Sequence, residues 1–359
     1  MKSVSVIIPL YNKRPYLDDC FESLLNQSTK PYEIIVADDG STDGSFESAC
    51  AFSSRFEALG IKFHALALEH GGVPRALGAA HEKATGDYLT RVDADDMVHP
   101  LWLETMLAQD KAHKHVDIRC QNTHIPESSS YPSLLESLSR PAKENETLNW
   151  GVIESGNTLY ERMFAQLDTS LMTTCGQFYV RQEIDSTHLV PRPELTHTED
   201  LAFNAQLFAH GNPVIVLEDV LYYYRQVSSS LSHAQTSLFE TVTKLDAFLQ
   251  ALQDYPATSR IACAHKHDSD RYLCWYYAIA LLEEERLRDE SVPFSERVED
   301  ARAVTSIDAV FSRAEQTDHV PTLARMLYAL LTQKQYAQLQ LAARTINVGR
   351  SLRRRLKTR

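Results

Sequence analysis

Apolar and polar positions alternate with two different periods along the first hundred residues. Short apolar runs of the kind that form β-strands occur at 3–9, 32–40, 61–68 and 87–96. Segments with helical spacing lie between them, at 15–27, 45–60 and 73–86. Strands separated by helices of this length indicate βαβ units. We therefore predict an α/β fold with a mostly parallel, Rossmann-like sheet flanked by helices.

The pattern changes after residue 110. Residues 115–175 are polar and contain several Ser and Pro, and we interpret them as an insertion or a variable binding region. Strand-like runs return at 176–181 and 212–225, and the pattern is helical from about Ser237 onward. Two apolar helical faces belong to this last part: Val242, Leu245, Phe248, Leu249 and Leu252, and then Leu323, Met326, Leu327, Leu330 and Leu331. We expect an α/β domain over 1–235 and a C-terminal helical region over 236–359.

Composition narrows the class of protein. The chain has 359 residues, 43% of them hydrophobic, which is enough to bury a large core in two parts. Its six cysteines are scattered without a CxxC pair, which argues against a zinc site or a disulfide framework and fits a reducing compartment. The first residues lack the length and cleavage site of a signal peptide, and no apolar run reaches the roughly 20 residues of a membrane-spanning helix. We expect a cytoplasmic protein.

Charge is distributed unevenly. The net charge of −12 argues against nucleic acid as a partner. The segment 349–359 is basic and contains no acid. An amphipathic helix with such a tail can lie on an anionic membrane surface, where each Lys or Arg contributes about 1 kcal/mol. The alternative is a packed helical subdomain with a solvated tail. We favour the first, a weak peripheral contact with the inner face of the cell membrane.

The densest concentration of acids closes the predicted strand at 87–96. Asp93, Asp95 and Asp96 follow one another closely, and Asp93 and Asp95 would project to the same side if the strand continued through them. Crowded carboxylates repel one another unless a cation is present, and Mg²⁺ or Mn²⁺ is bound by one or two carboxylates together with substrate phosphates. The alternative is a polar turn in which Asp96 caps the segment that follows. On this cluster alone the two interpretations are equally supported.

Two further strand ends carry candidate ligands. Asp38 and Asp39 end one predicted strand, and Pro9 and Tyr11 end another. A helix cap in the following turn would not account for two consecutive acids. A carboxylate in this position can accept a hydrogen bond from a ribose hydroxyl or a base N–H, and Tyr11 offers an aromatic face to a base. Ligands bind beyond the carboxyl ends of strands in an open parallel sheet, so the three strand ends predict a site for a nucleotide whose phosphates are held through a metal.

The chain also contains, in this order, "VSVIIPLYN", "IIVADDGSTDGS", "GGVPRALGAAHEKATGDYLTRVDADD", "HTEDLAFNAQLF" and "LYYYRQVSSSLSH". An Asp-x-Asp triplet alone is a weak signal, but the five segments together resemble glycosyltransferase family 2, the inverting transferases with a GT-A fold. The resemblance covers roughly residues 1–235. It implies a catalytic domain there, with a nucleotide-binding half at 1–110 and an acceptor-binding half at 111–235.

The resemblance also implies roles for the acids at the strand ends. Asp38 and Asp39 would contact the uracil and ribose of a UDP-sugar. Asp93 would contact the ribose and the metal, and Asp95 would be the direct ligand of Mn²⁺ or Mg²⁺. Further nucleotide contacts are expected at Pro9 and Tyr11.

Residues further along the chain complete the implied site. Asp200, in "TED", would be the catalytic base, with Glu199 supporting it, and Arg225 would approach the diphosphate. Asp96 and His233 are further supporting candidates. Without the family, the acids at 199 and 200 would be interpreted as a helix start that the helix dipole favours.

One position departs from the family's pattern. Family members often carry an Arg-Asn pair where this chain has Leu77-Gly78. Arg75 lies close by and is the candidate to take over a contact with the phosphate or the base.

The implied chemistry follows from the groups involved. A metal stabilises a leaving diphosphate, and an acceptor hydroxyl is a poor nucleophile until a carboxylate takes its proton. If Asp200 lies opposite the leaving group, the displacement is in line and inverts the anomeric carbon. A retaining mechanism would require a protein nucleophile.

We therefore predict a metal-dependent inverting glycosyltransferase that moves a hexosyl or N-acetylhexosaminyl group from a UDP-sugar to a saccharide or lipid-linked saccharide. The resemblance indicates bacterial cell-surface polysaccharide or lipopolysaccharide synthesis. One alternative is a sugar-phosphate nucleotidyltransferase, although the first residues contain no Gly-rich phosphate loop followed by Arg and Lys. The other is a noncatalytic scaffold that binds nucleotide-sugars or glycans, which the departure at Leu77-Gly78 keeps open.

Overall fold

The computed structural model describes residues 2–112, 116–138, 151–166, 168–187, 195, 198–227, 237–255, 266–287, 292–303, 307–315 and 322–357. It divides into two compact units, Met1–Leu159 with Thr169–His233, and Tyr160–Asp168 with Ala234–Arg359. The sequence placed the boundary two residues later and did not indicate that a short segment near residue 160 belongs with the helical unit. The division of the first unit into a nucleotide half and an acceptor half stays a prediction.

The first unit is built on a five-stranded sheet in the order β3–β2–β1–β4–β8. Its strands are β1 (Val4–Leu10), β2 (Glu33–Asp38), β3 (Lys62–Ala67), β4 (Tyr88–Arg91) and β8 (Tyr179–Val180). All neighbours are parallel except β4 and β8, which are antiparallel. The predicted α/β architecture with a mostly parallel sheet is confirmed.

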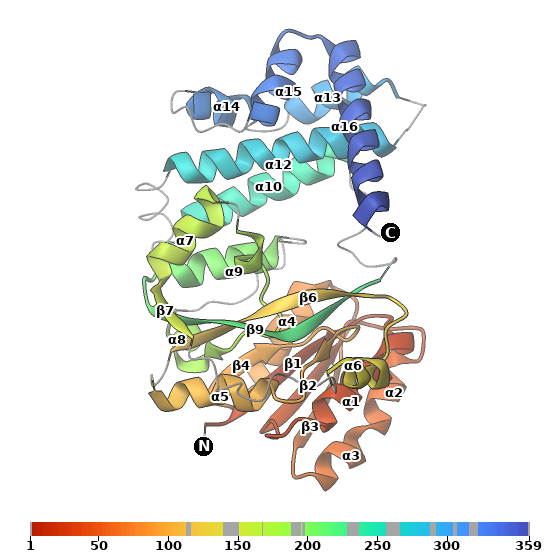
Figure 1. The fold of residues 1–359 in the computed structure, drawn as a ribbon, viewed down its shortest axis with the longest axis vertical. Helices are drawn as coiled ribbons and strands as arrows, with labels where there is room; N and C mark the ends of the chain where they lie inside the picture. The colour runs from red at the N-terminus through yellow and green to blue at the C-terminus, as the bar shows by residue number, and fades with distance from the viewer. Residues whose placement is uncertain are drawn as a thin grey trace. The chain divides into compact units, whose positions relative to one another are not determined.

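Helices lie against both faces of this sheet (Figure 1). α4 (Val73–Lys83) packs on β1 and β2 from one side. On the other side, alternate apolar residues of β1 share a core with four helices: α1 (Arg14–Leu25), α2 (Ser45–Ala51), α3 (Ser53–Ala58) and α5 (Trp102–Ala112). The predicted helix at 45–60 is interrupted at Phe52, which caps the end of α2 and the start of α3.

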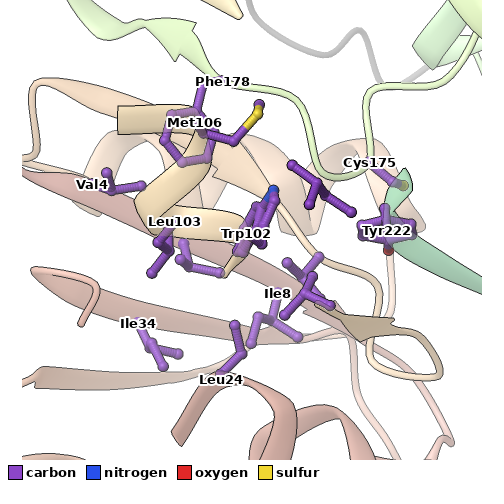
Figure 2. Close-up of a cluster of buried hydrophobic side chains, with 14 of the residues drawn as sticks. Val4, Ile8, Leu24, Ile34, Trp102, Leu103, Met106, Cys175, Phe178 and Tyr222 are labelled. Carbon is purple, nitrogen blue, oxygen red and sulfur yellow. The ribbon is translucent and has the colours of Figure 1, made fainter. Parts of the chain in front are cut away.

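The core of the first unit reaches the segment beneath the acidic residues. Figure 2 shows side chains of β1, β2, α1 and α5 converging around Trp102, with Tyr222 and Cys175 at the border of the same cluster. Trp102 is fully buried, and its indole N–H donates to the Gly176 carbonyl oxygen at 3.0 Å. Burying a side chain of this size contributes on the order of 3 kcal/mol or more, so the support under the candidate site is rigidly packed.

A second sheet accounts for much of the region that had no clear pattern. Its order is β5–β9–β6, with β7 also paired to β9, and its strands are β5 (Met97–Val98), β6 (Asp117–Pro126), β7 (Val152–Ser155) and β9 (Pro213–Gln226). The short helices of this part of the chain lie between β6 and β9 in the sequence: α6 (Tyr131–Leu138), α7 (Gly156–Ala165), η1 (Thr169–Leu171), α8 (Arg181–Thr187) and α9 (Glu199–Phe208). Met97 pairs with Tyr223, so β5 joins the chain directly after Asp96 to the long strand β9.

The second unit is helical, as predicted. It contains α10 (Leu238–Asp254), α12 (Lys266–Leu287), α13 (Phe294–Ala303), α14 (Ile307–Glu315), α15 (Thr322–Thr332) and α16 (Tyr336–Lys357). Leu245 and Leu327 are buried, as the two predicted apolar faces require. Met326 is 43% exposed, because the buried side of α15 is centred on Ala324, Leu327 and Leu331 and Met326 lies at its edge. Across the described residues, none of the helices combines the length and the apolar content needed to cross a bilayer.

Candidate active site

The carboxyl ends of β1, β2 and β4 meet at one edge of the first sheet. Leu10 of β1 pairs with Asp38 of β2, and Ile7 of β1 pairs with Arg91 at the end of β4. The backbone N–H of Asp39 then donates to the Leu10 carbonyl oxygen at 2.8 Å. The strand ends that the sequence singled out are therefore neighbours in space.

Asp39 holds the loop before α4 in place. Its two carboxylate oxygens accept hydrogen bonds from the backbone N–H groups of Gly71, at 2.7 Å, and Gly72, at 2.9 Å. The His70 Nδ1 lies 2.9 Å from the same carboxylate. Tyr11 stacks on the His70 ring, with centroids 4.5 Å apart and planes 24° from parallel. We call these five residues the Asp39 cluster.

Glycine at position 72 is required by this arrangement. Its φ of +88° lies in the left-handed region, where other residues are strained, and this conformation directs its N–H toward Asp39. Arg75 lies against the same loop, and its guanidinium donates to the Glu69 carbonyl oxygen at 3.2 Å. Arg75 is therefore beside the Asp39 cluster, where the sequence expected a basic group.

Asp38 and Tyr11 keep groups available for a ligand. One carboxylate oxygen of Asp38 accepts a hydrogen bond from the Ser41 N–H at 3.0 Å. The other oxygen is buried without a hydrogen-bond partner in the described part of the chain. The Tyr11 ring is 42% exposed, and Pro9 is part of β1 opposite Ala37. A buried acceptor without a donor is costly, which favours a ligand N–H or O–H at Asp38.

The loop after β1 is clipped to the loop after β2. Asn12 adopts a left-handed conformation, with φ of 51°, and its side-chain oxygen accepts the Thr42 N–H at 2.8 Å. The N–H of Lys13 donates to the Ser45 hydroxyl at 2.9 Å. These bonds fix the backbone of Lys13, whose ammonium group lies 2.6 Å from Asp95.

The acidic residues after β4 form a turn instead of a continued strand. β4 ends at Arg91, and the Asp96 N–H donates to the Asp93 carbonyl oxygen at 3.0 Å. The prediction that the strand carries Asp93 and Asp95 to one side is therefore wrong. The chain turns because its carboxylates reach different partners: Asp93 contacts Arg91 and Asp95 contacts Lys13. We call the segment Asp93 to Asp96 the acidic turn.

Asp96 supports the acidic turn from below. Its side chain is 1% exposed and accepts hydrogen bonds from the Tyr222 hydroxyl, at 2.6 Å, and the Arg225 N–H, at 2.8 Å. Burial, together with the charges of Asp95 and Asp93, raises the pKa of Asp96 well above its ordinary value. The alternative in which Asp96 caps a helix is wrong, because its oxygens are bonded to β9.

Arg225 is also enclosed by protein groups. It is 3% exposed, and its guanidinium donates to the Asp95 carbonyl oxygen at 2.8 Å and to the Glu127 carbonyl oxygen at 3.1 Å. It also donates to the Ser129 carbonyl oxygen, and it forms an ion pair with Asp19 at 3.1 Å. Its contact with a diphosphate stays a prediction. These bonds favour a role in holding the backbone of Asp95.

Asp200 lies in the first turn of α9 and is held on both oxygens. One oxygen accepts the Arg91 guanidinium at 2.6 Å and the Thr174 hydroxyl at 2.8 Å. The other accepts the Thr174 N–H at 3.2 Å. Arg91 also binds Asp93, through Nε at 2.6 Å and Nη2 at 3.2 Å. The guanidinium of Arg91 therefore contacts both the predicted base, Asp200, and the acidic turn, at Asp93.

Glu199 lies beside this ion pair in a low-dielectric setting. Burial raises the pKa of Glu199 to about 7, the charge of Asp200 adds to the effect, and Arg91 opposes it. An apolar pocket opens here, with walls that include Ile7, Leu77, Leu89, Tyr179, Ile184 and Phe203. Leu77, from the pair that departs from the family's pattern, belongs to this wall and not to the Asp39 cluster.

The residues of the acidic turn have the chemistry for a hard divalent cation. Asp95 already accepts a cationic group, the ammonium of Lys13, and carboxylate oxygens suit Mg²⁺ or Mn²⁺. Burial raises the pKa of Asp95, with Lys13 opposing and the charge of Asp93 adding, so a further positive charge would be favourable. No group of three or more His, Cys, Asp or Glu among the described residues could hold an ion alone. One or two carboxylates would need ligand phosphates to complete the coordination.

Sequence reasoning missed four residues of the site: Lys13, His70, Arg91 and Thr174. Arg91 stands in one of the quoted segments and Lys13 directly follows another, and a charged residue within an apolar strand is a signal that could have singled out Arg91. His70 and Thr174 have no comparable signal. His233 lies outside the described residues, so its supporting role stays a prediction.

The raised pKa of Glu199 predicts a pH dependence of stability. A carboxyl group whose folded pKa, about 7, exceeds its ordinary 4.5 stabilises the fold fully at low pH, and this contribution is lost as pH rises through 7. Glu199→Gln should reduce the fall in unfolding free energy between pH 4.5 and 8 by at most about 3 kcal/mol. Urea unfolding at a series of pH values measures it. Glu57→Gln, at an exposed position, is the control, and an unchanged slope in Glu199→Gln would contradict the prediction.

Comparison with known proteins places this geometry in a family. The model described as Glycosyl transferase family 2 matches residues 5–187, more than half of the chain. EpsJ of Bacillus subtilis, described as an uncharacterized glycosyltransferase, is 25% identical over 290 residues, which cover 78% of this chain and 77% of EpsJ. The glycosyltransferase GlyG of Streptococcus pneumoniae is 37% identical over 106 residues, 30% of this chain and 34% of GlyG.

A solved structure shares the fold. The crystal structure of S. aureus TarS 1–349 in complex with UDP-GlcNAc superposes with a TM-score of 0.64 at 17% identity, and covers 97% of this chain and 92% of that chain. This likeness supports the predicted GT-A fold with its C-terminal helical region. The match to the family model shows more than the fold and excludes the nucleotidyltransferase alternative, and together with relatives described as glycosyltransferases it supports an enzyme over a noncatalytic scaffold. The chain belongs to glycosyltransferase family 2 and is a glycosyltransferase.

Proposed function

We propose that this glycosyltransferase transfers a hexosyl or N-acetylhexosaminyl group from a UDP-sugar to a saccharide or lipid-linked saccharide, with inversion and with the help of a divalent metal. One observation carries the proposal: the Arg91 guanidinium contacts both Asp93 of the Asp-x-Asp and Asp200 of α9. A donor-side acid and a candidate base therefore lie on the two sides of one residue. The UDP-GlcNAc bound by the TarS structure supports a UDP-linked donor.

The Asp39 cluster and Asp38 would bind the nucleoside. The exposed Tyr11 ring offers a face to the uracil, and the unpartnered oxygen of Asp38 can accept a hydrogen bond from the base or ribose. Arg75, on the adjoining loop, supplies positive charge on this side. The oxygens of Asp39 are bonded to Gly71 and Gly72, so we propose that Asp39 shapes the nucleoside pocket.

Asp95 and Asp93 would hold Mn²⁺ or Mg²⁺ at the diphosphate. When bound, the metal would stabilise the negative charge of the leaving group. Lys13, on a flexible stem, contacts Asp95 and can turn to a phosphate oxygen when another cation takes its place. Asp93 is held by the buried fork of Arg91 and would remain on the ribose side.

Asp200 would take the proton of the acceptor hydroxyl. The three hydrogen bonds from Arg91 and Thr174 orient its carboxylate, and the pocket beside it has mostly apolar walls. The in-line geometry that gives inversion requires the acceptor to approach from the Asp200 side, opposite the diphosphate. The pKa of Glu199 is about 7, so Glu199 would carry a proton for part of the physiological pH range and would then add no second negative charge beside Asp200.

The first prediction from the proposed function concerns the metal. Because no described group of acids can hold an ion alone, UDP and Mn²⁺ should bind together and each only weakly without the other. Calorimetry should show that removal of Mn²⁺ with chelator weakens UDP binding at least about tenfold, and that Asp95→Ala removes this dependence. Asp18→Ala, an exposed acid of α1, is the matched control and should behave as the wild type. Equal UDP affinity with and without metal would remove the metal-dependent mechanism.

The second prediction concerns the base. Asp200→Asn keeps the shape of the side chain but cannot accept a proton, so sugar transfer should fall by about 10²-fold or more. UDP binding in the presence of Mn²⁺ should stay within about twofold of the wild type, since Asp200 lies on the acceptor side. Calorimetry and a transfer assay with UDP-GlcNAc measure the two quantities. Full transfer activity in this variant would exclude Asp200 as the base.

The third prediction concerns the membrane. We propose that the basic end of the chain brings the enzyme to an anionic bilayer where lipid-linked acceptors reside, as in cell-surface glycan synthesis. Co-sedimentation should show binding to vesicles with phosphatidylglycerol, no binding to phosphatidylcholine alone, and loss of binding in high salt. Replacing Arg353, Arg354 and Arg355 by Gln should abolish it. Replacing Arg14, Arg55 and Lys62, which are exposed in the first unit, removes the same charge and should not; equal loss in both variants would refute a tail-specific contact.

A further inference from the structure

Arg91 joins two parts of the site that are distant in the sequence. Its Nε and Nη2 contact the two oxygens of Asp93 at 2.6 and 3.2 Å. Its Nη1 contacts Asp200 at 2.6 Å and the Thr174 hydroxyl at 3.3 Å. All three nitrogens of one planar group are therefore committed, two to the acidic turn and one to the start of α9.

The charge of this guanidinium is permanent and its position is fixed. The side chain is 11% exposed at the end of β4. Burial alone lowers the pKa of Arg91, but the charges of Asp200 and Asp93 outweigh burial and hold it well above its ordinary value. A guanidinium presents its donors in a rigid fork, so it fixes both the direction and the separation of the two carboxylates.

The remaining contacts of the two carboxylates connect them only through the backbone between two consecutive residues, Thr174 and Cys175. Asp93 also receives the Cys175 thiol at 3.4 Å, and its N–H donates to the Tyr222 hydroxyl at 3.1 Å. Asp200 also receives the Thr174 hydroxyl and N–H. Within the described hydrogen bonds, Arg91 is the single side chain that reaches both acids. Arg91 is therefore the direct connection between the two acids, and the segment Thr174–Cys175 is an indirect one.

Stability does not require a residue of this kind. Replacing a buried ion pair by apolar groups of similar size is often neutral, whereas leaving one member unpaired is costly. The position continues the apolar strand β4, and the pocket next to it has apolar walls. An apolar side chain with neutral partners could therefore have filled a purely structural role. An arginine is needed at this position because Asp93 and Asp200 are both acidic.

We propose that Arg91 is a positioning residue for sugar transfer: it holds the base Asp200 at a fixed distance from the donor-side acid Asp93, so that the acceptor hydroxyl and the donor's anomeric carbon meet in line. This inference rests on the proposed roles of Asp93 and Asp200. In this role Arg91 contacts neither the donor nor the acceptor, and it affects the rate by positioning Asp93 and Asp200.

The two sides of Arg91 can be separated by mutation. Arg91→Met removes both contacts and leaves both acids without an ion-pair partner, so UDP binding with Mn²⁺ should weaken about tenfold and UDP-GlcNAc turnover should fall on the order of 10²-fold. Thr174→Val removes one hydrogen bond to Asp200 and leaves the contact with Asp93 intact. It should leave UDP affinity within about twofold while turnover falls about tenfold. Calorimetry with UDP and UDP release from UDP-GlcNAc measure these values on the full chain.

Two further variants make the result decisive. Arg91→Lys keeps the positive charge without the fork, and should retain the wild-type melting temperature within a few degrees while turnover stays at least about tenfold low. It carries the test if Arg91→Met does not fold. Arg302→Met breaks a comparable ion pair, with Asp308, in the helical unit and should change neither UDP affinity nor turnover.

Three outcomes are distinguishable. The inference is supported if Arg91→Lys has low turnover and if Thr174→Val has lower turnover but nearly wild-type affinity for UDP. Wild-type turnover in Arg91→Lys shows that charge compensation alone is needed and overturns it, as does wild-type behaviour of Arg91→Met. A wild-type enzyme that neither binds UDP nor releases it from UDP-GlcNAc removes the proposed donor, and with it the basis of the inference.

Discussion

The candidate site depends on the compensation of negative charge in the acidic turn. Burying neighbouring carboxylates without positive partners would cost several kcal/mol for each charge, and the groups would take up protons instead. The chain supplies Lys13 to Asp95, Arg91 to Asp93, and the N–H of Arg225 to Asp96. Strand β9, the loop after β1 and the end of β4 are all positioned by these contacts. Two cations, Lys13 and Arg91, and the neutral donors of β9 together fix the acidic turn in the fold.

The two cationic side chains differ in a way that assigns different roles to the aspartates they contact. Lys13 carries a compact charge on a flexible stem and is 21% exposed, whereas Arg91 is a rigid fork at 11% exposure. If a metal replaces the ammonium of Lys13, one contact is broken, the one between Lys13 and Asp95. Detaching Arg91 would break contacts to Asp93 and Asp200 together. Asp95 is therefore the residue free to change its partner, which favours it as the direct metal ligand and leaves Asp93 as a fixed point.

Local sequence signals predicted the parts of this arrangement that are local in the chain. The strands, the acids at their ends and the order of the segments follow from periodicity over ten to twenty residues. The contacts of Lys13 with Asp95 and of Arg91 with Asp200 span 82 and 109 residues, and no periodicity carries such pairings. The strand that was expected to run through Asp93 ends at Arg91, and the chain turns there with a local bond from the Asp96 N–H to the Asp93 carbonyl oxygen and a long-range contact from Asp95 to Lys13. Strand β6 was missed because six of its ten residues are partly or fully exposed, so it lacks a continuous apolar run.

The departure at Leu77 shows how one helix can serve both sides of the site. Residues two apart on a helix point in nearly opposite directions, so Arg75 lies beside the Asp39 cluster while Leu77 lines the pocket next to Asp200. An arginine at position 77 would bring a second cation to Asp200 and Glu199. With leucine there, the wall is apolar, the pKa of Glu199 rises to about 7, and the field of Arg91 acts on Asp200 in a medium of low polarity. The apolar wall therefore strengthens the contact on which the geometry of the site depends.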